Sequence, residues 1–295
     1  MAMKPIALHD TKHPNEIARV RYQGLVGIDS QKAELLEHLM RVFDPQRLIR
    51  WQKTHHPKGL RLMERMKECP HLVILGGEVG CGKTALAISV GTPVAEAIDR
   101  RVVALETPSD IRGGGLVGQL SERITAAFEE ARAGIGQNAG ILIIDEADDL
   151  GTSRAQMQAH HEDRAGVNVL IKEIDRIARE AVPLAVLLVT NRLNALDPAL
   201  VRRAQVIRFT RPDASARRAL FEHLLADVVH DPKDLDALVR SSKRKPLFSY
   251  SDLVVRGIEA ALLVSIRENK PLSAATLQAV IAELEPSPEV EDANQ

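Results

Sequence analysis

A glycine-rich octapeptide between an apolar run and an amphipathic segment most restricts how this chain can fold. Residues 77–84 read Gly-Glu-Val-Gly-Cys-Gly-Lys-Thr, which fits the pattern G-x-x-x-x-G-K-[ST]. The run 71–76 before it predicts a buried strand, and 82–98 after it predicts a helix. Glycines in such a turn let backbone N–H groups surround an anion, and the helix adds its positive amino end. We therefore expect a phosphate-binding loop between a strand and a helix.

Strand-like and helix-like segments continue to alternate after this loop. Apolar runs predict further strands at 102–106, 141–145, 184–190 and 206–209, and amphipathic segments predict helices at 119–132, 163–179 and 198–203. Strands this apolar, separated by helices, are typical of a parallel sheet that is covered on both faces. The expected fold class is α/β, with a parallel five-stranded sheet flanked by helices.

The strand pattern stops at Pro212, and only helices are predicted beyond it. These helices fall at 214–229, 233–241, 250–268 and 273–284. The change of pattern indicates a domain boundary. We expect an N-terminal arm at 1–23, a large α/β domain at 24–212, a small helical lid domain at 213–285 and an acidic flexible tail at 286–295.

Composition and charge exclude several classes of function. Lys and Arg total 39 against 40 Asp and Glu, and a formal net charge of -1 argues against a general nucleic-acid binder. The apolar runs have the length of strands and the N-terminus has no signal pattern, so we expect a cytoplasmic protein without a membrane partner. The segment 45–68 is locally basic. It fits a solvated helical face or a subunit contact, and alternatively a contact with a phosphate backbone.

Two carboxylates follow the strand predicted at 141–145. They are Asp145 and Glu146, at the carboxyl edge of the sheet, where parallel α/β sheets bind ligands. With the glycine loop one unit earlier, this pattern predicts an ATP site. Lys83 is expected to reach the β- and γ-phosphates, and Thr84 and Asp145 are expected to hold Mg²⁺. Glu146 is placed to polarise the attacking water.

Polar residues at two later positions are further candidates. Asn191 follows the strand at 184–190, where it can orient the same water or read the γ-phosphate, or serve only as a turn residue. Arg202 and Arg203 are either surface charge or arginine fingers that reach the γ-phosphate of a neighbouring subunit. The loop residues expected to bind nucleotide are Glu78, Val79, Gly80, Cys81, Gly82, Lys83, Thr84 and Ala85.

Together these motifs resemble those of AAA+ ATPases. The resemblance covers roughly residues 24–268 and includes Gly24-Leu-Val-Gly27, the loop, the Asp-Glu pair and the stretch from Thr190 to Arg203. It ends with Phe248-Ser-Tyr-Ser-Asp-Leu253 in the helical lid. It implies that Val26 and Gly27 lie on the adenine side of ATP. It also implies a homohexamer with ATP at the subunit interfaces and a central pore that pulls on a polypeptide substrate.

Within this group, the chain is similar to the pachytene checkpoint and thyroid-receptor-interacting protein 13 family, which remodels HORMA-domain proteins. The stretches 163–175, 201–205 and 211–215 carry this similarity. The chain resembles the compact bacterial members encoded beside HORMA proteins and cyclic-oligonucleotide synthases in antiphage operons. Disassembly of a HORMA–synthase complex is the function that this resemblance implies. The alternative is an AAA+ motor or loader that acts on nucleic acid.

The resemblance also assigns the pore loops and the lid. It places Leu116, Val117 and Gly118 in a pore loop, with Leu116 where the family has an aromatic residue, and it suggests a second pore loop at 151–166. The family's motif aligns its finger with Arg203, whereas the broader AAA pattern uses Arg202. The family's lid arginine falls at Ser251, which leaves Lys243, Arg244 or Lys245 as substitutes.

Overall fold

A computed structural model describes residues 6–66, 69–108, 119–149 and 161–290. Its centre is a six-stranded sheet in the order β1-β3-β4-β5-β2-β6. All strands except β1 are parallel, so the predicted α/β fold with five parallel strands is confirmed, and the prediction missed only the sixth, antiparallel strand. The bounds are His9–His13 for β1, Leu72–Gly77 for β2, Val102–Glu106 for β3, Ala139–Ile144 for β4, Leu184–Thr190 for β5 and Ala204–Phe209 for β6.

The missed strand β1 lies at the edge of the sheet, in the segment expected to be an arm. It pairs with β3 from His9 opposite Glu106 to His13 opposite Val102. Its side chains are polar, and only His13 is buried. An edge strand is held by backbone hydrogen bonds on one side only, so its side chains need not alternate between apolar and polar. The sequence of β1 therefore has no apolar pattern from which the strand could be predicted.

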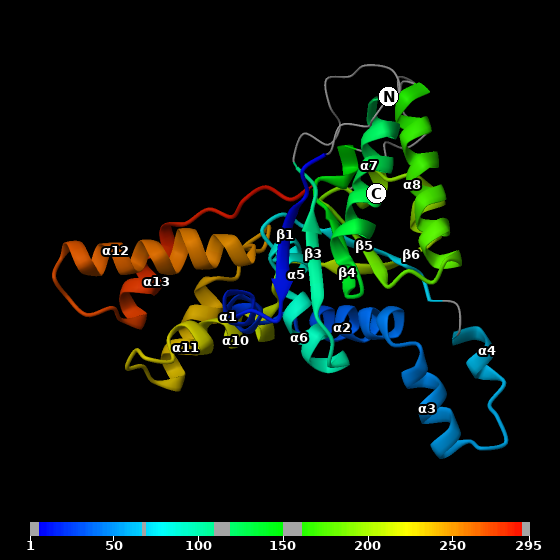
Figure 1. Cartoon of the computed structure of the whole chain (residues 1–295). Coiled ribbons are helices and arrows are strands. Elements are labelled where there is room, and N and C mark those ends of the chain that lie inside the picture. Colours follow the sequence, from blue (N-terminus) through cyan, green and yellow to red (C-terminus); the bar gives the residue numbers. More distant parts are fainter. Residues whose placement is uncertain (1–5, 67–68, 109–118, 150–160, 291–295) are drawn as a thin grey trace.

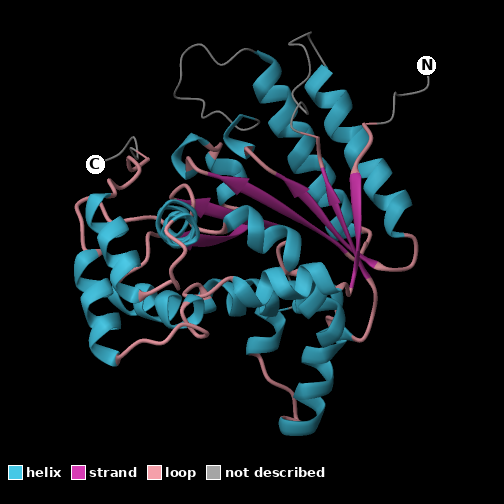
Figure 2. Ribbon diagram, turned by 90° about the vertical axis from the view of Figure 1, so that its left-hand side faces the viewer, coloured by secondary structure: helices cyan, strands magenta, loops and turns pink. Residues whose placement is uncertain are grey.

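The two faces of the sheet bury alternate residues of the same strands. Leu72 and Ile74 pack under α7 and α8, whereas Val73 and Leu75 pack against α2, α5 and α6. Figures 1 and 2 show the helices on the two sides of the sheet. Strand β5 is central in the sheet, and helices cover it on both faces, which explains its continuous apolar run. The helices run Asp29–Phe43 (α2), Lys83–Ser89 (α5), Gly91–Ile98 (α6), Gln119–Ile135 (α7) and His161–Arg179 (α8).

A helical lid follows β6 and lies beside the sheet (Figure 1). It has a core of its own, which includes Phe221, Leu238 and Phe248. Asp213 begins the lid by accepting the backbone N–H of Ala216, an N-cap of the usual kind. The elements are α10 (Ala214–Leu224), α11 (Pro232–Ser241), the π-helical segment η3 (Asp252–Glu259), α12 (Ala260–Arg267) and α13 (Ala274–Glu283).

Several short elements were not predicted. The basic segment 45–68 contains the helices α3 and α4, which project away from the sheet in Figure 1. Over the described ranges, no helix is long and apolar enough to span a membrane. The unpredicted elements are α1 (Glu16–Gly24), α3 (Gln46–His55), α4 (Leu62–Met66), η1 (Ala147–Asp149) and η2 (Leu193–Ala195). The short helix predicted at 198–203 is present as α9 (Pro198–Val201).

Candidate nucleotide-binding site

The glycine-rich loop connects β2 to α5, as the sequence predicts. Gly77, Gly80 and Gly82 have φ angles of 132°, 69° and 88°. A Cβ at Gly77 would stand 2.1 Å from the carbonyl oxygen of Phe209, so no other residue fits there without movement. Cys81 is buried, and burial raises the pKa of its thiol to about 11. The thiol is therefore protonated at neutral pH and is not a redox-active thiolate.

Lys83 is the first residue of α5 and lies inside the loop. Its side chain is buried, and its ammonium donates hydrogen bonds to the carbonyl oxygens of Gly77 at 2.7 Å and Glu78 at 2.6 Å. Burial lowers its pKa, although nearby acidic groups, including Asp145, oppose that shift. The loop thus holds a positive charge at the amino end of a helix, an arrangement suited to an anion.

Thr84 lies after β2 and the glycine loop, and Asp145 lies directly after β4; their side chains contact each other at the carboxyl edge of the sheet. The Thr84 hydroxyl donates a 2.8 Å hydrogen bond to one carboxylate oxygen of Asp145. The other oxygen accepts the backbone N–H of Glu146 at 2.8 Å. Both Thr84 and Asp145 are exposed, so their oxygens are accessible from solvent.

Glu146 has a left-handed backbone with φ of 52°, which is unusual for a residue with a side chain. Such conformations cost free energy and persist only where the surroundings impose them. The carboxylate is exposed beside Asp145, and the two residues follow β4 at the carboxyl edge of the sheet. Strand β4 therefore delivers the two predicted carboxylates to the edge that carries the glycine loop.

The end of β5 lies between these two groups. Gly76 of β2 pairs with Thr190, so Asn191 stands level with Gly77 at the start of the loop. The Thr190 hydroxyl donates to Asp148 at 2.9 Å and accepts the Arg192 N–H at 3.0 Å, which fixes the turn that carries Asn191. Sequence reasoning did not single out Asp148, because an aspartate in a short turn gives no signal until its partner is known.

Arg202 and Arg203 lie at the opposite end of β2. Ala204 pairs with Leu72, the first residue of β2, whereas the loop begins at Gly77, the last. At about 3.3 Å per residue, these ends are roughly 17 Å apart, beyond the reach of an arginine side chain. The Arg203 side chain donates to the Ala199 carbonyl oxygen at 3.2 Å, and its Nε lies 3.8 Å from a carboxylate oxygen of Asp175. Arg202 bonds through its backbone N–H to the Pro198 carbonyl oxygen at 3.0 Å. The predicted arginines are therefore not brought to the loop of their own chain.

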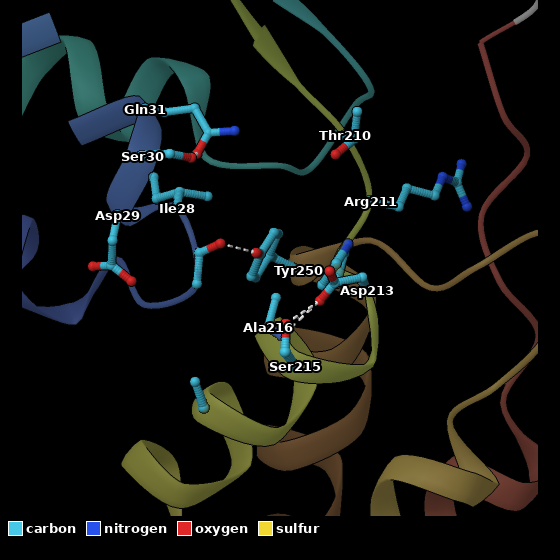
Figure 3. A pocket seen from close by; sticks show the side chains of 13 residues that line it. Ile28, Asp29, Ser30, Gln31, Thr210, Arg211, Asp213, Ser215, Ala216 and Tyr250 are labelled. Carbon is cyan, nitrogen blue, oxygen red and sulfur yellow. Dashed lines mark hydrogen bonds between the residues drawn. The ribbon is translucent and has the colours of Figure 1, made fainter. Parts of the chain in front are cut away.

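The segment of Val26 and Gly27 contacts the lid. The Tyr250 hydroxyl donates a 2.6 Å hydrogen bond to the carbonyl oxygen of Gly27. Figure 3 shows this contact beside a pocket of about 480 Å³, between the large domain and the start of α10. The lid also reaches the loop directly, because the Ser251 backbone N–H donates to the Gly80 carbonyl at 3.0 Å. Tyr250 belongs to the lid stretch that carries the family resemblance, but its contact with Gly27 was not predicted.

The three basic residues considered as replacements for a lid arginine lie elsewhere. Lys243, Arg244 and Lys245 line a different pocket with Leu247 and Glu289, and Arg244 donates to the Ala282 carbonyl at 3.3 Å. The predicted pore-loop residues Leu116, Val117 and Gly118, and most of the second predicted pore loop, lie outside the described residues.

The basic segment carries less free charge than its composition suggests. Arg47 pairs with Glu37 at 3.0 Å, and Arg50 pairs with Asp44. These pairs tie α3 back to α2 and the turn after it. They weaken the interpretation of this segment as a contact with a phosphate backbone.

Comparison with known proteins assigns this chain to a family. The pattern described as "ATPase family associated with various cellular activities (AAA)" matches residues 73–212. CD-NTase-associated protein 6 of Escherichia coli strain MS 115-1 is 36% identical over 282 residues, which is 91% of this chain and 90% of the relative. The chain belongs to the AAA ATPases, and within them to the family of CD-NTase-associated protein 6.

Solved structures agree with this assignment. A chain of the E. coli MS115-1 HORMA:CdnC:Trip13 complex matches with a TM-score of 0.90 at 34% identity, over 96% of this chain and 98% of that one. Rhizobiales Trip13 matches with a TM-score of 0.77 at 31% identity, over 95% and 98% of the two chains. The resemblance to the thyroid-receptor-interacting protein 13 family that the motifs suggested is therefore confirmed.

Proposed function

We propose that this chain is a Mg²⁺-dependent ATPase that assembles into a homohexameric ring and disassembles a complex containing a HORMA-domain protein. The observation that carries the proposal is the likeness, along nearly the whole chain, to the solved HORMA:CdnC:Trip13 complex. The nucleotide site supports it independently. The glycine loop, Lys83, Thr84, Asp145 and Glu146 lie together at one edge of the sheet.

The residues around the loop fit ATP and a magnesium ion. The Thr84 hydroxyl and the Asp145 carboxylate are exposed, hard oxygen donors 2.8 Å apart, which is the donor chemistry that Mg²⁺ prefers. We assign the nucleotide contacts to Val26, Gly27 and the loop residues Glu78 to Ala85. Bound Mg²⁺ would neutralise charge on the phosphates, and Lys83 would turn from the loop carbonyls toward the β- and γ-phosphates.

Glu146 and Asn191 are the proposed residues for the attacking water. The exposed Glu146 carboxylate would accept a proton from the water, because no other bond engages that carboxylate among the described residues. Asn191 follows Thr190 at the end of β5, level with Gly77 at the start of the loop, and would orient the water or the γ-phosphate.

A second copy of the chain would complete the site. Arg202 and Arg203 lie at the wrong end of β2 to serve their own loop, so they can stabilise transition-state charge only at a neighbouring subunit. A residue at one end of the molecule that serves a site at the other end generates a head-to-tail interface, and such an interface forms a ring when the rotation between subunits closes. We therefore propose that the ring is a hexamer with ATP between subunits.

The proposed substrate is a polypeptide in a complex with a cyclic-oligonucleotide synthase. The solved relative contains HORMA and CdnC beside Trip13. We propose that this chain acts on the corresponding pair and so regulates antiphage signalling, with Leu116 gripping the threaded polypeptide.

Dissociation of a HORMA–synthase complex, measured beside ATP hydrolysis, tests this function. Leu116→Ala should keep basal hydrolysis and lose dissociation, while Leu116→Tyr should retain both. Arg50→Gln with Lys53→Gln should leave dissociation unchanged. If the basic-segment variant fails and Leu116→Ala works, or if ATP turnover rises steeply with DNA, a nucleic-acid motor replaces this proposal.

A further inference from the structure

Arg211, at the hinge between the two domains, joins three separate parts of the chain. Its Nε donates a 3.0 Å hydrogen bond to the carboxylate of Glu78 in the glycine loop. Its remaining nitrogens donate to the carbonyl oxygens of Leu247 in the lid at 2.5 Å, Ser287 at 2.8 Å and Pro288 at 2.7 Å. Figure 3 shows the side chain pointing away from Tyr250 toward the C-terminal segment, drawn in red.

This guanidinium is buried and has no substitute. The side chain of Arg211 is only 4% exposed, and Glu78 is 23% exposed. An arginine fork offers five donors in one plane, so it can bind a carboxylate and several carbonyls together, whereas a lysine ammonium offers three donors from one point. Removal of Arg211 would leave a mostly buried carboxylate and three carbonyls without their cation.

The C-terminal segment is held by a second anchor close by. The Ser287 backbone N–H donates to Asp252 at 3.1 Å, and the Ser287 hydroxyl donates to the same carboxylate. Burial opposes ionisation of Asp252, but hydrogen bonds from Ser287 and Ser249 and from Arg256 outweigh it and lower its pKa to about 2. Ser287 and Pro288, in the segment expected to be flexible, therefore lie between two charged anchors in the lid and the hinge.

Arg211 connects the nucleotide loop, the lid and the C-terminal segment through one side chain. The Ser251–Gly80 bond and the Tyr250–Gly27 bond are the other connections described above, and a pocket of about 480 Å³ separates the domains next to them. A change in the Glu78 side chain is thus transmitted through one rigid guanidinium to the lid and the C-terminal segment.

We propose that Arg211 is a positioning residue for the ATP site, which couples nucleotide binding in the loop to docking of the C-terminal segment 284–290. Nucleotide phosphates would place negative charge beside Glu78 and so strengthen the hold on the guanidinium. By linkage, the docked segment strengthens nucleotide binding to the same degree. This inference rests on the proposed ATP site.

Hydrogen exchange in the full-length protein tests the coupling. The readout is the peptide spanning 284–290, in which Ser287 carries the amide bonded to Asp252. A non-hydrolysable ATP analogue with Mg²⁺ should slow this exchange about fivefold or more in the wild type. In Arg211→Lys the effect should fall below about twofold, and the KM for ATP should rise about tenfold with kcat changed much less. Glu78→Gln should also reduce the effect, by at least half.

Arg217→Lys is the matched control. Arg217 is equally buried, but it bonds to Ser242 and to the carbonyls of Pro212 and Val239, and not to the loop. It should keep the full nucleotide effect even if it loses stability. Calorimetric nucleotide binding, measured in parallel, separates failure of the ATP site from failure of the coupling. Unchanged exchange in nucleotide-bound wild type, a full effect in Arg211→Lys, or equal loss in Arg217→Lys would overturn the proposal.

Discussion

Lowering the pH should destabilise the protein through His13, the buried end of the edge strand β1. The residue is 1% exposed, and Nδ1 bonds to the Thr92 hydroxyl at 2.9 Å, whereas Nε2 is buried and has no hydrogen-bond partner among the residues that the structure describes. Its ring also lies so close to Gly91 that a Cβ there would approach it to 2.4 Å. Burial lowers the pKa of His13 from 6.5 to about 4, because a charged imidazole cannot be solvated there.

The size of the effect follows from this shift. Between pH 6.5 and 4 the unfolded chain binds a proton at this position that the folded chain does not, so the free energy of unfolding falls as the pH falls. At about 1.4 kcal/mol per pKa unit, the loss approaches about 2 kcal/mol between pH 6.5 and 5, and about 3 kcal/mol by pH 4.

Urea unfolding at pH 7 and pH 5 measures this loss. His13→Phe keeps a ring of similar size but cannot titrate, so its unfolding free energy should change by about 2 kcal/mol less than that of the wild type between these pH values. His9→Phe, on the same strand but exposed, is the control and should keep the wild-type dependence. If His13→Phe shows the full wild-type loss, the reasoning from burial is wrong.

Two further predictions concern strained backbone near the proposed nucleotide site. Glu146→Gly should raise the free energy of unfolding by about 0.5–1 kcal/mol, since glycine accepts the φ of 52° without strain, and it should abolish hydrolysis; thermal melts and ATPase rates measure the two effects. The control is Asp99→Gly, at a φ of 49°, which should gain similar stability and keep its activity. Gly80→Ala should weaken ATP binding and lower stability, because φ is 69° and its Cβ would lie 2.9 Å from Ser249 and Ser251 of the lid; calorimetry would refute this by finding wild-type affinity.

Strands β2 to β5 were predictable because each is a largely apolar run in a covered parallel sheet. Strand β6 is an edge strand that includes Gln205 and Arg208, and it begins two residues before the apolar run predicted at 206–209. Strand β3 lies at 102–106 and β5 at 184–190, as expected. The edge strand β1 was not predicted because its side chains are polar and only His13 is buried, so no apolar pattern marks it. The predicted helix at 82–98 is divided at Val90 into α5 and α6, next to Gly91 and Pro93. Proline has no backbone N–H to continue the helical hydrogen bonds, so the division could have been predicted from the sequence.

Part of the candidate site could also be predicted from the sequence, and part could not. The loop and the Asp-Glu pair were predictable because their chemistry requires fixed residue types at fixed spacing. The contacts of Arg211 were not, since Glu78 lies 133 residues away in the chain and Ser287 lies 76 residues away. Only the fold brings these residues together, and no local pattern marks an arginine after a strand as a hinge.

ATP binding and hydrolysis by Glu146→Gln test the central claim most directly. The amide keeps the shape of the side chain but cannot accept the proton of the attacking water, whereas Lys83, Thr84 and Asp145 are untouched. The account predicts Mg-ATP affinity within about threefold of the wild type and hydrolysis reduced about a hundredfold or more, with Lys83→Ala losing binding itself. Hydrolysis by Glu146→Gln at the wild-type rate would contradict the assignment of this site.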